Sequence, residues 1–139
     1  MAAGPYIQRN PYKGTTSRCW VRLRFAAADG SVHERELVAD TGSPFAVIFG
    51  LADLTLLSHA PAPGTNSNFG PLRGSWLELS TPELGLTGQI RGFGSDAVWQ
   101  GVQRDSADFA GLAGLPLLRL VEYGGDATAF WVRKAGGVP

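Results

Sequence analysis

Four consecutive residues, Asp40-Thr41-Gly42-Ser43, offer the clearest chemistry in the chain. One apolar segment, residues 37–39, leads into the carboxylate, and a second apolar segment, residues 45–49, follows it. Moving an isolated carboxylate from water into apolar surroundings costs several kcal/mol unless a partner shares the charge. We therefore expect Asp40 to have such a partner and a role that justifies its position.

A second segment, residues 111–119, has the sequence GLAGLPLLR, with two apolar residues before Gly114. With the Asp40 turn it resembles the retropepsin-like, single-lobe aspartic proteases. In that family two apolar strands lead into Asp-Thr-Gly-Ala/Ser, and an apolar-apolar-Gly segment later precedes a short helix. The resemblance spans roughly residues 18–132. Two residues depart from the pattern: Pro44 follows Ser43, and Ala113 is smaller than the branched residue usual before that glycine.

The resemblance implies a fold and an activity. The fold would be all-β, a single acid-protease lobe built as a closed or orthogonal barrel, with one short helix near residues 115–121. The activity would be that of an aspartic endopeptidase with Asp40 as its catalytic residue and with no cofactor. Four residues would support the catalytic turn: Thr41, Gly42, Ser43 and Gly114.

The supporting residues have separate expected roles. Gly42 would permit a backbone geometry that a side chain resists and would keep its amide close to the carboxylate. Thr41 would, by resemblance, join the turns of two copies through its hydroxyl. We expect Ser43 to donate a hydrogen bond to the ionised carboxylates, which favours an acidic pH optimum.

The activity needs two carboxylates about 3 Å apart that share one proton. No other aspartate of the chain stands in an apolar-apolar-Asp-Thr/Ser-Gly frame. The nearest, Asp105-Ser106-Ala107, lacks both the glycine and the apolar pair. We therefore expect Asp40 to pair with Asp40 of a second copy across a twofold axis, in a homodimer that cleaves polypeptide.

Two other interpretations stay open. The lobe could be catalytically idle and serve as a dimerisation or peptide-binding module. It could also process only its own precursor or one dedicated partner. Juxtaposed Asp40 carboxylates would favour the enzyme, and a monomer would favour the module.

Residues 61–74 are rich in Gly, Asn and Ser, as a long surface loop would be. In the resembling family this region carries a flap that closes over bound peptide. A mobile surface loop is the alternative, but the apolar side chains of this region favour a flap. The expected substrate-binding residues are Phe69, Gly70 and Leu72.

The composition limits the other possibilities. The 139 residues are 44% hydrophobic and 17% charged, which predicts one globular domain over residues 18–139 after a flexible N-terminal arm, residues 1–17. The formal net charge is zero, so we expect neither a nucleic-acid partner nor a membrane partner. The single Cys19 excludes an internal disulfide. His33 and His59 are isolated, so no metal site is expected, and the lack of a leader pattern predicts a cytoplasmic protein.

Period-2 alternation predicts a hairpin of two strands, residues 20–25 and 32–39, with Asp29-Gly30 at its turn. The pattern of residues 51–57 does not decide between helix and strand. Further strands are predicted over residues 45–49, 76–79, 84–90, 97–102 and 128–132. The two halves of the chain show weak internal symmetry, because each contributes a strand pair, a turn and an apolar element, once through residues 40–42 and once through residues 112–114.

Overall fold

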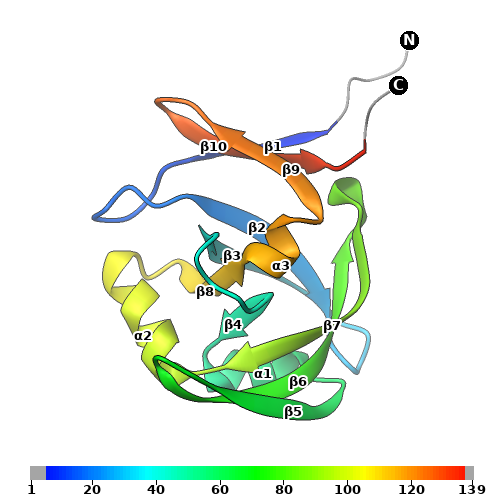
Figure 1. The fold of residues 1–139 in the computed structure, drawn as a ribbon. Coiled ribbons are helices and arrows are strands. Elements are labelled where there is room, and N and C mark those ends of the chain that lie inside the picture. The colour runs from blue at the N-terminus through cyan, green and yellow to red at the C-terminus, as the bar shows by residue number, and fades with distance from the viewer. Residues whose placement is uncertain (1–5, 137–139) are drawn as a thin grey trace.

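The computed structural model describes residues 6–136 and shows a mostly β protein (Figure 1). Strands account for 55% and helices for 18% of it, with six strands closed into a mixed barrel beside a small three-stranded sheet. The expected β-rich fold with a closed barrel is confirmed. The expected short helix near residues 115–121 is present as α3 (Leu115–Leu118), but it is not the single helix, since α1 (Leu51–Leu57), α2 (Asp96–Asp105) and the 3-10 turn η1 (Pro82–Leu84) accompany it.

The barrel strands follow the order β2-β3-β8-β4-β7-β6, and pairing of β2 with β6 closes the ring. Their bounds are β2 (Trp20–Ala26), β3 (Val32–Asp40), β4 (Val47–Phe49), β6 (Gly70–Thr81), β7 (Leu86–Gly94) and β8 (Phe109–Gly114). Buried aliphatic and aromatic side chains fill the interior, where the Phe25 and Phe49 rings meet edge to face at 5.2 Å.

The first hairpin matches its prediction. β2 and β3 pair antiparallel from Trp20 opposite Val38 to Ala26 opposite Val32. Gly30 adopts a φ of +87° in the turn, a conformation that a side chain would resist. Leu23 and Phe25 are buried while Arg22 and Arg24 are only partly covered, as alternation requires.

The barrel is internally symmetric, because β2, β3 and β4 of one half correspond in position to β6, β7 and β8 of the other. The expected match of residues 40–42 with residues 112–114 is wrong: residues 112–114 end β8 and correspond to residues 48–50 after the Asp40 turn, while the counterpart of that turn is the connection through α2. β3 and β4 lie on either side of β8, and β7 and β8 lie on either side of β4. The parallel pairs are β3 with β8 and β4 with β7. Residues 45–56 and 109–120 carry Phe, Ala, Gly and three Leu at corresponding positions, and each segment runs from a strand through a glycine into a helix.

The segment between the two halves is an ordered hairpin. β5 (Ala60–Ser67) pairs antiparallel with the first part of β6, so the surface-loop alternative for residues 61–74 is wrong. The pairing shifts register between Ala62 and Thr65, where Gly64 and Gly74 allow the two backbones to approach closely. Residues 51–57 are helical.

The predicted strand over residues 97–102 is instead part of the helix α2. The Ser95 side chain accepts a hydrogen bond from the Val98 amide and caps the first turn. Val98 and Val102, four residues apart, are the buried residues of the helix, while Gln100 midway between them is exposed, which fits a helix and not a strand. Alternation over so few residues could not separate the two structures.

The N-terminal segment is not a flexible arm in its described part. β1 (Ile7–Pro11) pairs with β10 (Ala129–Lys134), which also pairs with β9 (Val121–Gly125) to complete the small sheet. Residues 1–5 lie outside the described residues. Polar composition concealed the strand, because β1 holds its place through backbone pairing and amide side chains rather than apolar burial.

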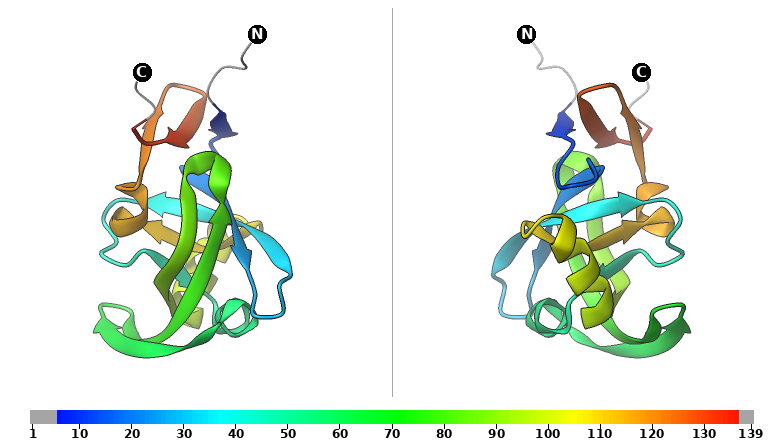
Figure 2. Two further views of the ribbon diagram at one scale, coloured as in Figure 1. Left: turned by 90° about the vertical axis from the view of Figure 1, so that its right-hand side faces the viewer. Right: turned by 90° about the vertical axis from the view of Figure 1, so that its left-hand side faces the viewer.

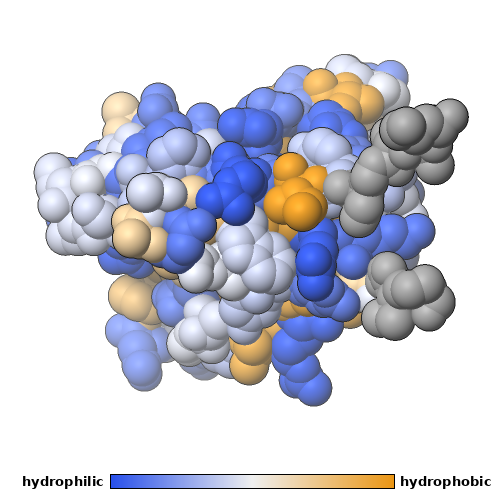
Figure 3. Space-filling model, turned by 90° about the horizontal axis from the view of Figure 1, so that it is seen from above, coloured by the Kyte–Doolittle hydropathy of each residue, from blue (hydrophilic) through white to orange (hydrophobic). Residues whose placement is uncertain are grey.

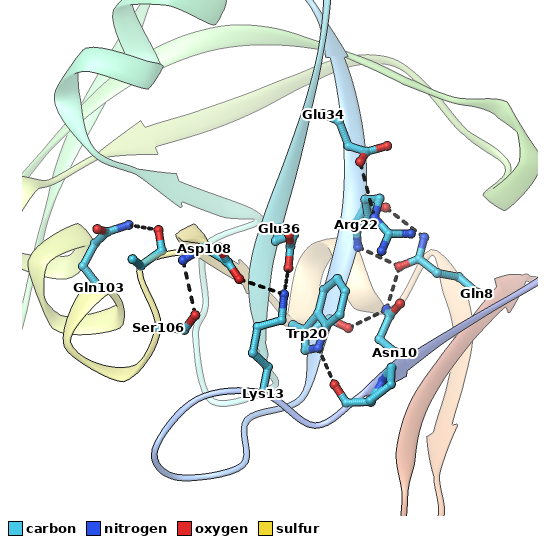
Figure 4. Close-up of polar contacts among 12 residues, drawn as sticks. Gln8, Asn10, Lys13, Trp20, Arg22, Glu34, Glu36, Gln103, Ser106 and Asp108 are labelled. Atoms are coloured by element: carbon cyan, nitrogen blue, oxygen red, sulfur yellow. Dashed lines mark hydrogen bonds and ion pairs between the residues drawn. The ribbon is translucent and has the colours of Figure 1, made fainter.

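Two buried amide side chains join β1 to the barrel (Figure 4). Gln8 accepts from the Arg22 amide at 2.6 Å and donates to the Arg22 carbonyl at 3.0 Å. Asn10 donates to the Trp20 carbonyl at 2.8 Å. β1 therefore satisfies backbone groups of β2 that its strand neighbours leave free.

Replacing Gln8 by Leu should lower the free energy of unfolding by about 2–6 kcal/mol. The change leaves the partly buried N–H and C=O of Arg22 unpaired, at roughly 1–3 kcal/mol each. Arg9→Gln is the matched control on the outward side of the same strand; it loses an exposed ion pair with Asp126 worth at most about 1 kcal/mol. Urea unfolding of both variants measures the difference, and equal effects would contradict a structural role for Gln8.

Candidate active site at the Asp40 turn

Asp40 is the last residue of β3 and lies opposite Gly114, the last residue of the parallel strand β8. Leu37 and Val38, before it in the strand, are fully buried. Asp40 itself is partly buried, and Thr41 is exposed at the turn. The carboxylate therefore sits at the end of the barrel, between the core and solvent.

The turn holds the carboxylate through its own backbone. The Gly42 amide donates to Asp40 Oδ1 at 2.9 Å, and the Ser43 amide donates to the Asp40 carbonyl at 3.1 Å. A β-carbon at position 42 would lie 3.2 Å from Oδ1. The expectation that Gly42 keeps an amide beside the carboxylate is confirmed.

Gly114 lies where the chain after Asp40 crosses the end of β8. A β-carbon there would lie 2.0 Å from the Phe45 carbonyl oxygen and 2.7 Å from the Ser43 carbonyl oxygen. The Gly114 amide donates to the Ala46 carbonyl at 2.9 Å, and the Leu115 amide donates to the Ser43 carbonyl at 3.0 Å. Gly114 thus supports the turn, and the fully buried Ala113 precedes it.

The Ser43 hydroxyl does not take its expected partner. Ser43 is buried, and its Oγ accepts from the Phe45 amide at 3.3 Å and lies 3.4 Å from the Phe45 carbonyl oxygen. The expected hydrogen bond to the Asp40 carboxylate is absent from the described chain. Ser43 instead stabilises the segment leading to β4, so it gives no basis for expecting an acidic optimum.

Two cavities flank the turn. One of about 200 Å³, here called the α2 cavity, is bordered by Asp40, by Leu112 of β8, by Phe69 and by residues of α2. The other, of about 480 Å³, lies between residues 44–46 and Thr65 of β5. The segment after β3 and the turn between β5 and β6 project from the same side of the molecule (Figure 2). The α2 cavity is bordered by Asp40 and by Phe69 of the hairpin turn, and the larger cavity by residues 44–46 and by Thr65.

The three expected flap residues occupy different positions. Phe69 is 60% exposed at the tip of the β5–β6 hairpin and borders the α2 cavity. Gly70 has a φ of +94°, which the turn requires. Leu72 is 2% exposed and packs into the core with Val38 and Phe93, so it anchors the hairpin. The expectation that Leu72 contacts a bound molecule is therefore wrong.

The hairpin is tied to the barrel at its register shift. Arg91 of β7 donates to the Pro63 carbonyl at 2.6 Å and to the Gly64 carbonyl at 3.2 Å. Its guanidinium lies over the Phe93 ring, 4.8 Å from the centroid. The part of the hairpin beyond this clamp carries Phe69.

The N-terminal loop reaches the same site, which the sequence did not indicate. Asp105, at the end of α2, accepts hydrogen bonds from the Thr15 hydroxyl at 2.7 Å and from the Thr16 hydroxyl and amide at 2.7 and 2.9 Å. Arg18 lies 3.8 Å from the same carboxylate. The Thr15 hydroxyl foremost, then the Thr16 hydroxyl, lowers the pKa of Asp105 from 3.8 to about 2.

The remaining candidates have structural partners. His33 interacts with the Ser31 hydroxyl at 2.8 Å, and His59 with the Ala26 carbonyl at 2.6 Å. Within residues 6–136 no group of three or more His, Cys, Asp or Glu side chains could hold a metal ion. No helix in the same range has the length and apolar character needed to cross a membrane.

Comparisons of the chain with protein-family models, with curated proteins and with solved structures find no match. What the site can do therefore rests on its own geometry. A partly buried carboxylate, fixed by a backbone amide, borders the α2 cavity, which the exposed aromatic residue of the hairpin turn also borders.

Gly114→Ala should destabilise the protein by about 3 kcal/mol or more, because the new methyl group collides with two backbone carbonyls rather than with a side chain that could move. Gly101→Ala is the matched control. A β-carbon there meets no atom within 4 Å, so alanine should stabilise the helix by about 0.5–1 kcal/mol. Urea unfolding tests both signs, and a Gly114 variant as stable as the parent would refute the close contact.

The contact of Asp105 with the N-terminal loop should persist in acid. Because its pKa falls from 3.8 in the unfolded chain to about 2 in the fold, its stabilising contribution is complete above pH 3.8 and is lost as the pH falls through 2. A ¹³C carboxylate titration should give a midpoint near 2, and the Thr16 amide should exchange faster below it. Asp105→Asn should speed that exchange at neutral pH. Asp126→Asn, in the β9–β10 turn, should not.

Proposed function

We propose that the protein is a retropepsin-like aspartic endopeptidase whose active site is completed by a second copy of the chain. The observation that carries the proposal is the Asp40 carboxylate, held by the Gly42 amide at 2.9 Å, on the floor between the turn and the β5–β6 hairpin. An extended polypeptide would lie in this space as an added strand, with the hairpin over it.

The chemistry of the proposal is the addition of water to a peptide carbonyl. One carboxylate accepts a proton from the water as its oxygen bonds to the carbonyl carbon, while the protonated partner donates to the carbonyl oxygen. Proton transfer to the nitrogen then breaks the C–N bond and releases an acid and an amine. A single carboxylate cannot hold both roles, so a second one must stand close by.

Asp105 borders the same cavity, yet it does not suit the second role. Three hydrogen bonds from Thr15 and Thr16 occupy its oxygens, and these contacts hold its pKa near 2. It would therefore stay ionised and could not serve as the proton donor. This favours Asp40 of a second copy, with the exposed Thr41 at the contact between the two turns.

The surface is consistent with contact through the turn. Seen from above, the face over β1, β9 and β10 is mostly hydrophilic, with hydrophobic residues only in small separate groups (Figure 3). That face nevertheless exposes Tyr6, Ile7 and Tyr123, so the proposed contact through the turn rests on the need for a second Asp40 rather than on apolar exposure. The side that carries the Asp40 turn and the hairpin tip also carries the exposed Phe69 and Leu120.

Asp40→Asn should lower the rate of peptide cleavage by roughly 10²–10⁴-fold while leaving unfolding by urea unchanged, because an amide cannot act as the base. Asp108→Asn, an exposed carboxylate that pairs with Lys13, is the control and should retain activity. Cleavage of a mixed peptide library, read by mass spectrometry, measures both. Equal rates for the parent and the Asp40→Asn variant would contradict the proposal.

The shared site is tested on the same preparation by dilution. If only dimers carry a complete pair of carboxylates, activity should fall with the square of the protein concentration once monomers dominate. Activity proportional to concentration in that range would exclude a shared site. A dimer that binds a statine-type peptide but cleaves nothing would instead identify the catalytically idle module.

A further inference from the structure

The larger of the two cavities, here called the α3 cavity, measures about 480 Å³ and is not bordered by Asp40. α3 and the segment after β3 lie side by side (Figure 1), and the Leu115 amide donates to the Ser43 carbonyl between them. All but two of the residues that line the cavity are apolar: Pro44, Phe45, Ala46, Ile90, Phe93, Pro116, Leu117 and Leu120. The other two are Thr65 and Arg91. Apolar walls with few polar groups are typical of sites that bind small molecules.

The charge in the α3 cavity belongs to Arg91. Within residues 6–136 every ion pair involves another arginine or a lysine, so Arg91 has no carboxylate partner there. Its hydrogen bonds run to the Pro63 and Gly64 carbonyls, which are neutral acceptors. A partly buried guanidinium thus borders an apolar cavity without a compensating anion, which favours an anionic ligand.

The walls of the α3 cavity offer few hydrogen bonds to the body of such a ligand. Pro44 has no backbone N–H. The Phe45 amide already donates to the Ser43 hydroxyl oxygen, and the Ala46 carbonyl already accepts from the Gly114 amide. Peptide groups placed against these walls would lose water without gaining partners. The cavity therefore favours a hydrocarbon body over a polypeptide.

The size of the α3 cavity sets the length of that body. An apolar cavity of about 150 Å³ is large enough for the six carbons of benzene. A volume of about 480 Å³ accommodates a chain of roughly ten carbons and leaves room for water around the charged end. Leu120 is 54% exposed, so the cavity is open to solvent at this wall and a ligand can enter there.

We propose that the α3 cavity binds an amphipathic carboxylic acid, an unbranched alkanoate of roughly eight to twelve carbons. The carboxylate pairs with Arg91, and the chain lies along Phe45, Leu117 and Leu120. This ligand is distinct from the polypeptide of the proposed function, and its binding does not require peptide cleavage. A bound alkanoate would contact the segment after Asp40 and the hairpin at once, through residues 44–46 and Thr65.

The first test varies the ligand. The full chain is titrated by calorimetry at neutral pH with hexanoate, octanoate, decanoate, octan-1-ol and octylammonium. Decanoate should bind at one site with a Kd below about 1 mM. Each added CH₂ between hexanoate and decanoate should tighten binding about 4-fold, as burial of one methylene predicts. Octan-1-ol and octylammonium should bind at least about 10-fold more weakly than octanoate, because they cannot form the charged hydrogen bond with Arg91.

The second test varies the cavity. Leu120→Glu places a carboxylate beside the bound one and removes an apolar contact, so octanoate should bind about 5-fold more weakly or worse. Leu56→Glu is the matched control, because Leu56 is a similarly exposed leucine that does not line the cavity. It should stay within about 2-fold of the parent. Arg91→Met should weaken octanoate at least about 10-fold and leave octan-1-ol unchanged.

Arg91 also holds the hairpin, so urea unfolding accompanies the Arg91→Met measurement. If that variant does not fold, Leu120→Glu, which leaves the Arg91 contacts in place, decides the outcome. Amide resonances of Thr65, Ile90 and Leu120 should shift with octanoate in the parent. Shifts confined to other parts of the chain would overturn the proposal.

Equal affinities for octanoate and octan-1-ol, or equal effects of Leu120→Glu and Leu56→Glu, would also overturn it. An apolar dipeptide acid, N-acetyl-Leu-Leu, is compared with its amide. If the dipeptide acid binds more tightly than decanoate and the amide does not bind, the ligand is the end of a polypeptide and the proposal fails. A chain that binds octanoate and cleaves no peptide would contradict the proposed function alone. A chain that cleaves peptides and binds no alkanoate would contradict the alkanoate site alone.

Discussion

The arrangement of the site depends on one steric constraint, the passage of the chain over the end of β8. β3 and β4 lie on opposite sides of β8, so the segment after Asp40 must cross that strand to enter β4. The crossing brings the Ser43 and Phe45 carbonyls onto Gly114 at distances that exclude a side chain. Because the turn is pressed against the barrel in this way, its carboxylate is held at the surface in a defined place.

The other half of the chain makes a corresponding crossing, but the segment that crosses has a different structure. The chain between β7 and β8 must pass the end of β4, where Gly50 replaces Gly114 and the Trp99 ring lies 2.9 Å from the position of a β-carbon. Here the connection is the helix α2 rather than a tight turn. The crossing in the first half of the chain thus carries the Asp40 carboxylate. The crossing in the second half is the helix α2, which borders the same cavity.

Contacts between segments far apart in the sequence fix the elements around the Asp40 turn. The N-terminal loop binds the end of α2 through Asp105, and the Arg91 clamp positions the base of the hairpin that carries Phe69. The Asp105 carboxylate is thereby occupied by hydrogen bonds from the N-terminal loop, although it borders the same cavity as Asp40. Within residues 6–136 this leaves Asp40 as the carboxylate of the cavity without a side-chain partner, which is why the proposed chemistry requires a second copy.

Local patterns determined the β-rich class, the Asp29-Gly30 hairpin, the Asp40 turn and the role of Gly42, because alternation and turn chemistry act between neighbouring residues. The sequence also indicated an internal symmetry, but it matched residues 40–42 with 112–114; the likeness of residues 45–56 to 109–120, which gives the correct correspondence, was recognised only with the fold. The sequence could not separate helix from strand at α2, because its two buried valines fit a short strand nearly as well. The tertiary structure alone decided that the Ser43 hydroxyl pairs with Phe45 and that Leu72 is buried. It also decided that β1 is held through Gln8 and Asn10, and that Gly101 and Asp40 border the same cavity. Those outcomes depend on contacts between distant segments, which no local pattern encodes.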